Sequence, residues 1–235
     1  MTGKCIAVTR PLPDGARTAS AVRAAGHDVV LSPLLRIEPV AADLAGAWSA
    51  VIVTSQNAAR AVAVHRHRAA LIGLPVFAVG EQTANAAREA GFAKVTAGGR
   101  DAGELIALLT ARAREFVRPL LYIAGEERAA DIAGAMARVD VAMTTAVVYR
   151  AARLPFSADL VTALQGGALD VVLHFSKRSA ESFLAGAKAA AVVEKSLVVR
   201  HLCLSAQVAA PLVAAGAKAT AVAPRPEEAA LLALI

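Results

Sequence analysis

The sequence predicts an α/β protein made of two similar domains, each built around a parallel β-sheet. Short apolar runs alternate along the chain with alanine-rich segments of helical length. Of the 235 residues, 57% are hydrophobic but only 4% are aromatic. The many alanines and valines combine helix formers with β-branched residues. The chain also repeats itself once, and its length allows two cores of ordinary size.

Seven short apolar runs have the length and composition of buried strands. The segments between them are long enough for helices, and strand–helix–strand alternation favours parallel sheets. Two further segments are extended but interrupted by polar residues, and they are Leu34–Val40 and Ala146–Ala151. The seven strand-like runs are Ile6–Val8, Val29–Leu31, Val51–Val53, Val76–Val79, Leu120–Ile123, Val171–Leu173 and Leu202–Leu204.

Similar phrases mark the ends of three expected helices. RAAG ends at Gly26, REAG at Gly91 and VAAG at Gly216, and a strand-like run follows each. A glycine just past a helix typically adopts the left-handed conformation that stops it. At the other end of the first helix, Asp14 is the expected N-cap.

The internal repeat relates the two halves of the chain. When Val76–Leu109 is shifted by 125 residues it meets the segment that contains Leu202–Leu234. Gly91 then coincides with Gly216, and Arg100 with Arg225. The period is far longer than that of a solenoid unit, so it indicates two domains of one design.

The two extended segments indicate that the domains are not sequential. We interpret them as two passes of one connection, which makes the middle of the chain an insertion. The outer domain then comprises residues 1–37 and 151–235, and the inserted domain residues 41–147. Residues 38–40 and 148–150 form the two-segment connection, and we expect a cleft between the domains.

The net charge of +6 is spread over the chain. No long Lys/Arg run with interleaved aromatics occurs, which argues against a nucleic-acid partner. A basic balance suits an acidic small molecule, although a merely basic surface would have the same composition.

The chain has no segment of the kind that directs secretion or crosses a membrane, so we expect a cytoplasmic protein without a membrane partner. Cys5 and Cys203 each stand within an apolar run and are expected to be buried thiols. No Cys/His spacing typical of a metal site occurs, so we expect no metal. With no further apolar stripe left over, we expect a monomer.

Polar turns follow most of the expected strands, where helices begin. In parallel sheets, ligands bind outside the carboxyl ends of the strands, and helix N-termini there offer free N–H groups. Two domains facing each other would line one cleft with these turns, which suits a ligand with several carboxylates. The alternative is that each turn only caps its helix. The candidate ligand-binding residues are Thr9, Arg10, Thr54, Ser55, Gln56, Asn57, Gly80, Gln82, Thr83, Gly125, Ser176, Lys177, Ser205 and Gln207.

Several motifs are missing. The chain has no G-x-G-x-x-G after a strand, no P-loop and no G-x-S-x-G elbow. A nucleotide-dependent enzyme is therefore a poor alternative, and a periplasmic solute-binding protein would need a signal segment. The pattern indicates neither a strong nucleophile nor a cofactor site.

The sequence resembles the uroporphyrinogen-III synthase family over nearly its whole length. The matching segments are IAVTRP (Ile6–Pro11), SPLLRIEP (Ser32–Pro39), VIVTSQNAARA (Val51–Ala61), FAVGEQTANAAREAGF (Phe77–Phe92), LLYIAGEERAADIAGAM (Leu120–Met136), VVYRA (Val147–Ala151) and LCLSAQVAAPLVAAGA (Leu202–Ala217). The resemblance implies two Rossmann-like or flavodoxin-like domains joined by a two-stranded connection. It also implies cyclisation of hydroxymethylbilane, a linear tetrapyrrole, to uroporphyrinogen III, with loss of water, inversion of the last pyrrole ring and no cofactor.

The family's tyrosine in the connecting segment falls on Tyr149, which implies a phenol that donates a proton or hydrogen bond to the departing hydroxyl. An aromatic packed at a domain junction is the alternative. Tyr122 lies mid-strand and is expected to be core.

Three of the candidate binding positions have a second interpretation. Arg10 either gates the cleft or braces its own turn, and Lys177 either contacts carboxylates or is solvated. Many relatives carry a threonine in the turn where this chain has Ser205–Val208, which leaves a side-chain role of Ser205 open. A scaffold that binds a polycarboxylate without catalysis is the alternative function.

Overall fold

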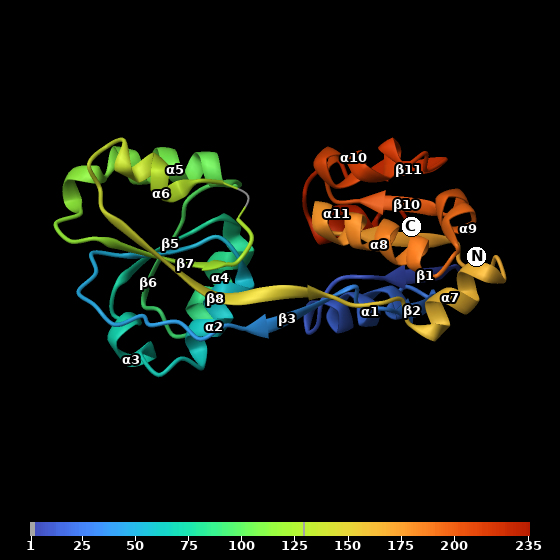
Figure 1. Cartoon of the computed structure of the whole chain (residues 1–235), viewed down its shortest axis with the longest axis horizontal. Helices are drawn as coiled ribbons and strands as arrows, with labels where there is room; N and C mark the ends of the chain where they lie inside the picture. Colours follow the sequence, from blue (N-terminus) through green and yellow to red (C-terminus); the bar gives the residue numbers. More distant parts are fainter. Residues whose placement is uncertain (1–2, 129) are drawn as a thin grey trace. The chain divides into compact units, whose positions relative to one another are not determined.

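The structure is a computed structural model that describes residues 3–128 and 130–235 (Figure 1). The chain divides into two compact units. Unit 1 contains the described residues up to Arg36 together with Ala152–Ile235, and unit 2 is Ile37–Ala151. Strands β3 (Leu35–Pro39) and β8 (Met143–Arg153) each cross a boundary between the units.

Unit 1 is a five-stranded sheet in the order β11-β10-β9-β1-β2, with every pair parallel. One face packs against α7, α8 and α10, around Phe183. The other packs against α1 and α11. The strands are β1 (Cys5–Val8), β2 (Asp28–Leu31), β9 (Val171–His174), β10 (Arg200–Cys203) and β11 (Ala219–Val222). The helices are α1 (Asp14–Ala24), α7 (Ala158–Gln165), α8 (Lys177–Ala189), α9 (Val193–Val198), α10 (Ala206–Ala214) and α11 (Glu228–Leu232).

Unit 2 is a six-stranded sheet in the order β3-β8-β7-β4-β5-β6, and the pairs from β8 to β6 are parallel. Helices α2, α3 and α4 cover one face, and α5 and α6 the other. The remaining strands are β4 (Val51–Val53), β5 (Pro75–Ala78), β6 (Lys94–Ala97) and β7 (Leu120–Gly125). The helices are α2 (Gln56–Ala63), α3 (Arg68–Leu71), α4 (Gly80–Glu89), α5 (Ala102–Ala111) and α6 (Ile132–Ala137), with a 3₁₀ turn at Ala113–Glu115.

The predicted α/β class with parallel sheets is confirmed, and each of the seven apolar runs overlaps a strand. Strands β6 and β11 were not predicted from the sequence, and both are edge strands with exposed or half-buried residues throughout. An edge strand has one partner and needs few apolar residues, so its pattern is weak. Both follow the repeat, because Lys94 and Ala219, where they begin, are 125 residues apart.

The three expected helix-stopping glycines have left-handed backbones. Their φ angles are 86° at Gly26, 100° at Gly91 and 87° at Gly216. The expected cap at Asp14 is wrong, because Pro13 occupies the N-cap position of α1 and Asp14 is the first helical residue. The Asp14 carboxylate instead pairs with Arg10 and Arg17. Within the described residues, every helix is too short or too polar to span a membrane.

Candidate functional site

The carboxyl ends of three neighbouring strands bring the polar turns of unit 2 together. Strands β5, β4 and β7 lie side by side in parallel, so the turns that follow them meet at one edge of the sheet. Thr54 and Ser55 follow the central strand of these three. This edge holds the predicted catalytic tyrosine as well, because Gly125, the last residue of β7, pairs with Tyr149 of β8.

The Tyr149 hydroxyl contacts the N-cap of α2. Its oxygen lies 2.9 Å from Ser55 Oγ. Ser55 has an extended backbone, and its Oγ accepts a hydrogen bond from the Ala58 N–H at 3.1 Å. Ser55 Oγ therefore has two partners. It accepts a hydrogen bond from an N–H group that has no partner within α2, and it forms a hydrogen bond with the Tyr149 phenol.

A break in the β7–β8 register aims Tyr149 at this edge. Ala124 pairs with Val147 but Gly125 pairs with Tyr149, so Val148 is an extra residue in β8. Side chains normally alternate between faces along a strand, and a bulge re-aims them. Here Val148 and Tyr149, although adjacent, both contact the core cluster beneath α2 and α4.

Gly125 makes room for the phenol ring. A Cβ atom at this position would lie 2.6 Å from Tyr149 Cζ, a distance that non-bonded atoms do not tolerate. The Glu126 N–H also donates to the Tyr149 carbonyl at 2.9 Å. The half-buried ring is therefore held against the β7 backbone with its hydroxyl at the sheet edge.

Tyr122 is more than a core residue. Its ring is only 3% exposed, as expected, but its hydroxyl lies 3.0 Å from Thr54 Oγ1. Burial raises the pKa of the Tyr122 phenol, and the hydrogen bond with Thr54 opposes that shift. Ile52 pairs with Tyr122, so Thr54 lies two residues further along the same face. This contact could not be predicted from the sequence alone, because it depends on the pairing of β4 with β7.

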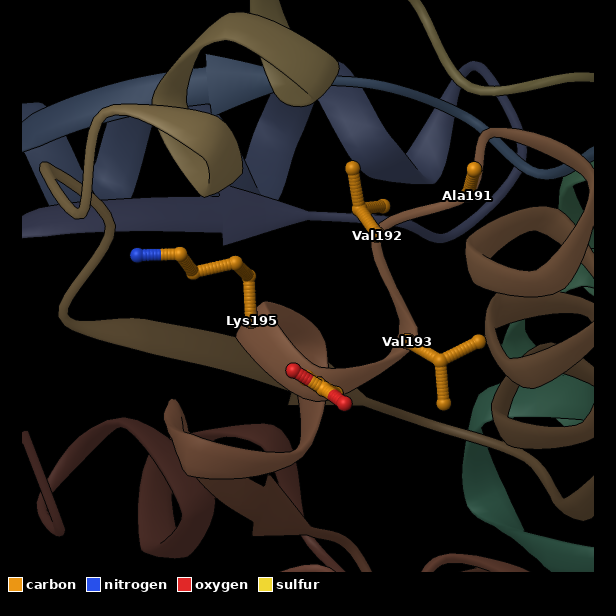
Figure 2. Close-up of a pocket in the computed structure, with 5 residues that line it drawn as sticks. Ala191, Val192, Val193 and Lys195 are labelled. Atoms are coloured by element: carbon orange, nitrogen blue, oxygen red, sulfur yellow. The ribbon is translucent and has the colours of Figure 1, made fainter.

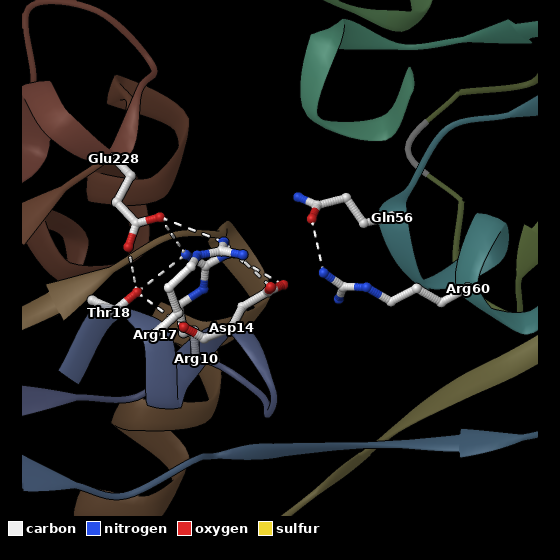
Figure 3. A network of polar contacts seen from close by, with 7 residues as sticks. All are labelled: Arg10, Asp14, Arg17, Thr18, Gln56, Arg60 and Glu228. Carbon is white, nitrogen blue, oxygen red and sulfur yellow. Dashed lines mark hydrogen bonds and ion pairs between the residues drawn. The ribbon is translucent and has the colours of Figure 1, made fainter. Parts of the chain in front are cut away.

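The other predicted residues of unit 2 lie on α2 and α4. Gln56 accepts a hydrogen bond from Arg60 at 3.1 Å (Figure 3), and Asn57 beside it is half-buried. The Gly80 N–H donates to the Gly99 carbonyl at 2.7 Å, so the fold already uses that donor. Gln82 is exposed and Thr83 is buried.

In unit 1, strands β10, β9 and β1 are neighbours, so their turns also share one edge. Arg10, after β1, is held on several sides (Figure 3). Its guanidinium contacts the Glu228 carboxylate at 3.1 Å and Asp14 at 3.5 Å, and it lies 4.2 Å from the centre of the Phe175 ring. Burial lowers the pKa of Arg10, and the Glu228 and Asp14 carboxylates oppose that shift. These contacts favour the bracing interpretation of Arg10.

Thr9, which follows β1, forms a hydrogen bond with a neighbouring strand. Its side chain is fully buried and donates a hydrogen bond to the Leu173 carbonyl at 2.9 Å. The side chain predicted to bind ligand therefore joins β1 to β9 and is closed to solvent in this structure.

The remaining predicted residues stand at the starts of α8 and α10. Ser176 forms a capping box with Ser179. Lys177 is exposed and lies 3.8 Å from Glu181. Ser205 is at the N-cap of α10 without a side-chain cap hydrogen bond to the described residues, and Gln207 is exposed.

Two cavities of unit 1 lie away from these turns. One, of about 310 Å³, is lined by Ala191–Lys195 (Figure 2). The other, of about 390 Å³, includes Asp170 and Arg200, near the amino ends of β9 and β10. Neither contains a predicted site residue. Among the described residues, no group of His, Cys, Asp and Glu side chains is arranged to hold a metal ion.

Comparisons with known proteins give a match to one family model and to solved structures of the same fold. The sequence model of the family described as uroporphyrinogen-III synthase HemD matches residues 16–233. A structure of uroporphyrinogen-III synthetase from Helicobacter pylori 26695 has the same fold, with a TM-score of 0.68 and 18% identity, and the match covers 99% of this chain and 97% of that one.

A mutant uroporphyrinogen III synthase from the extremely thermophilic bacterium Thermus thermophilus gives a TM-score of 0.59 at 18% identity, over 99% of this chain and 97% of that one. A search of curated protein sequences found no match. Because the family model spans nearly the whole sequence, the chain belongs to the uroporphyrinogen-III synthase family.

Proposed function

We propose that Tyr149 is the proton donor and that the strand-end turns hold the substrate carboxylates in the reaction of this family. The family is one of cyclising lyases of haem biosynthesis that act on a tetrapyrrole, and this chain is a member. Its reaction closes hydroxymethylbilane to uroporphyrinogen III, with loss of water and inversion of the last ring.

The reaction depends mainly on how the enzyme orients its substrate. The pyrrole nitrogen helps to expel the hydroxyl as water, so the enzyme needs only modest acid assistance at the departing oxygen. Spontaneous closure gives the non-inverted type I isomer. The protein must therefore hold the flexible chain so that the substituted carbon of the last ring is attacked, which is catalysis by orientation.

The geometry around Tyr149 carries the acid role. The phenol is half-buried at the carboxyl edge of the unit 2 sheet, where ligands of parallel α/β proteins bind. Its ring lies against Gly125 and its hydroxyl against Ser55, so its position is fixed before substrate arrives. If Tyr149 served only to pack against its neighbours, its hydroxyl would not need to lie at the N-terminus of α2.

The substrate carboxylates suit the starts of α2, α8 and α10. Each of these helices follows the carboxyl end of a parallel strand, and the first N–H groups of a helix have no partner within it. The chain's net charge of +6 favours an anionic substrate. We propose that backbone N–H groups, more than side chains, bind the carboxylates, since Ser55 and Ser176 Oγ already cap their helices.

We further propose a cytoplasmic monomer that uses neither metal nor organic cofactor and binds neither nucleic acid nor membrane. A scaffold without catalysis is disfavoured by the family match and by the preformed contact between Tyr149 and Ser55.

The test is to incubate the purified protein with hydroxymethylbilane, oxidise the products and separate the porphyrin isomers by chromatography. Type III product far above the spontaneous type I background is expected. In Tyr149→Phe, the rate of type III formation should fall about a hundredfold, the size of a typical general-acid contribution. A folded Tyr149→Phe variant with the full rate would refute the acid role.

A further inference from the structure

We propose that Ser55 is a positioning residue for Tyr149, which directs the phenol proton toward the substrate. From the sequence, Ser55 was predicted to be one of the ligand-binding residues. The inference rests on the proposed function of Tyr149 and gives Ser55 a different role, in which it acts through the phenol and not on the substrate.

The hydrogen-bonding capacity of Ser55 sets this role. A serine hydroxyl has one proton to donate and two lone pairs. The Ala58 N–H uses one lone pair at 3.1 Å, and the Tyr149 oxygen lies 2.9 Å away. When Ser55 donates its proton to Tyr149, the phenol's own proton is left to point elsewhere. The chain of bonds then runs from the Ala58 N–H through Ser55 and Tyr149 to the substrate.

This direction is the one that the acid step needs. As Tyr149 gives its proton to the departing hydroxyl, the O–H bond of the phenol breaks and negative charge grows on its oxygen. The C–O bond of the substrate breaks with its electron pair going to oxygen, and water leaves. Only a Ser55 that donates can stabilise the phenolate. The attacked carbon is substituted and carries no proton. The phenolate therefore regains its proton from the unsubstituted α-carbon of the same ring, which loses its hydrogen when the bridge moves to it and the inverted ring is complete.

The residues around Ser55 and Tyr149 hold the two side chains in contact. Ser55 is fixed by its extended N-cap backbone, with φ at −147° and ψ at 149°. The Tyr149 ring already lies so close to the Gly125 backbone that a Cβ atom added at Gly125 would clash with it. The ring therefore has no room to move further in that direction. The positive end of the α2 dipole lies at the same Ser55 oxygen and favours the developing anion.

The chain supplies two matched controls. Tyr122→Phe removes the other phenol–hydroxyl bond of the same turn, the 3.0 Å contact with Thr54, and keeps the hydrogen bond between Ser55 and Tyr149. Asp101→Ala removes a second N-cap of unit 2, whose carboxylate accepts from the Glu104 N–H at 2.9 Å. Together they separate loss of a bond at the turn, and loss of a cap, from loss of the contact with Tyr149.

The experiment measures kcat and KM for type III formation. In Ser55→Ala, kcat should fall about tenfold with little change in KM, the size of one hydrogen bond to a charged group. Ser55→Thr should restore most of the rate. Tyr122→Phe and Asp101→Ala should keep kcat within about twofold of the wild type, since both leave the hydrogen bond between Ser55 and Tyr149 in place. If Ser55→Ala fails to fold, Ser55→Gly replaces it, because glycine is a better N-cap than alanine.

A spectroscopic measurement tests the contact without activity. The chain has two tyrosines, so protein labelled with ¹³C at tyrosine Cζ gives two resonances, and Tyr149→Phe assigns them. Ser55→Ala should shift the Tyr149 resonance, and Ser55→Thr should return it. Asp101→Ala should leave it unchanged.

The outcomes separate this inference from the proposed function. An unmoved Tyr149 resonance with wild-type kcat in Ser55→Ala would overturn the inference and leave the function intact. A loss confined to KM would also overturn it, because Ser55 would then bind substrate. Wild-type protein that makes only type I porphyrin would refute the function instead, and the resonance would still decide whether Ser55 holds the phenol.

Discussion

Acidification should weaken unit 1 through two buried histidines, and the effect can be worked from the structure. His174 and His201 are fully buried on β9 and β10, with His174 Nε2 3.0 Å from His201 Nδ1. His201 Nε2 lies 3.1 Å from the Ser196 carbonyl, which can only accept. His201 Nε2 therefore donates, His201 Nδ1 accepts from His174, and His174 Nδ1 has no hydrogen-bond partner among the described residues. Both rings are neutral, and a proton added to either would be a buried charge.

The pKa shifts of the two histidines give the direction and the size of the change in stability with pH. Burial lowers the pKa of His201 to about 4, and burial, with the nearby His201, lowers the pKa of His174 well below its ordinary value. A depressed histidine pKa means that the unfolded chain binds more protons, so stability falls as pH falls below about 6.5. From pH 7 to pH 5, His201 alone should cost unit 1 about 2 kcal/mol, and His174 adds to this in the same direction.

Urea unfolding followed by circular dichroism at pH 7 and pH 5 measures the loss. With a urea slope of about 2 kcal/mol/M, the midpoint of unit 1 should fall by about 1 M or more. A variant with both His174→Leu and His201→Leu should lose most of this pH dependence, whatever its absolute stability. His27, which is half-buried and accepts a hydrogen bond from the Lys4 N–H, serves as the control in His27→Gln. An unchanged pH dependence in the double leucine variant would refute the reasoning.

Two further predictions concern charges and caps in unit 1. Glu228→Gln removes the carboxylate that pairs with Arg10, so urea unfolding should show that the free energy of unfolding falls by about 2 kcal/mol. The control is Glu227→Gln, whose side chain is more exposed. An equal loss of stability in the control would show that only the net charge matters. Ser176→Ala removes a capping box and should cost about 1 kcal/mol. Ser205→Ala removes no cap hydrogen bond seen among the described residues and should change stability by less than about 0.5 kcal/mol in the same assay, so an equal cost for both would contradict the cap assignment.

Much of the fold could be predicted because its signals are local. Each buried strand is an apolar run, and the glycines that stop helices have the same neighbours in both halves of the chain. The internal repeat then indicated that the second domain has the same design as the first. The edge strands β6 and β11 were missed for the same physical reason, since a strand such as KVTA that buries little apolar surface looks like a loop.

The candidate site was predictable only in part. Tyr149 and the turn at Ser55 were both expected from the sequence, but as separate features. Their contact depends on the extra residue in β8, a pairing detail between distant segments that leaves no local trace. The buried Thr9 side chain depends in the same way on β1 lying beside β9.

The order of the strands in unit 1 also bears on how the protein is made. Strand β1 pairs with β9, so the partner of Ile6 is Val171, which leaves the ribosome much later. A nascent chain that has reached Arg153 contains the whole of unit 2 but only β1, α1 and β2 of unit 1. This first segment of unit 1 ends at Arg36, and a chain shorter than about 40 residues buries too little surface to fold by itself. Unit 2 can therefore complete its fold during synthesis, while the first segment of unit 1 must wait, unpaired on one side, until the second returns.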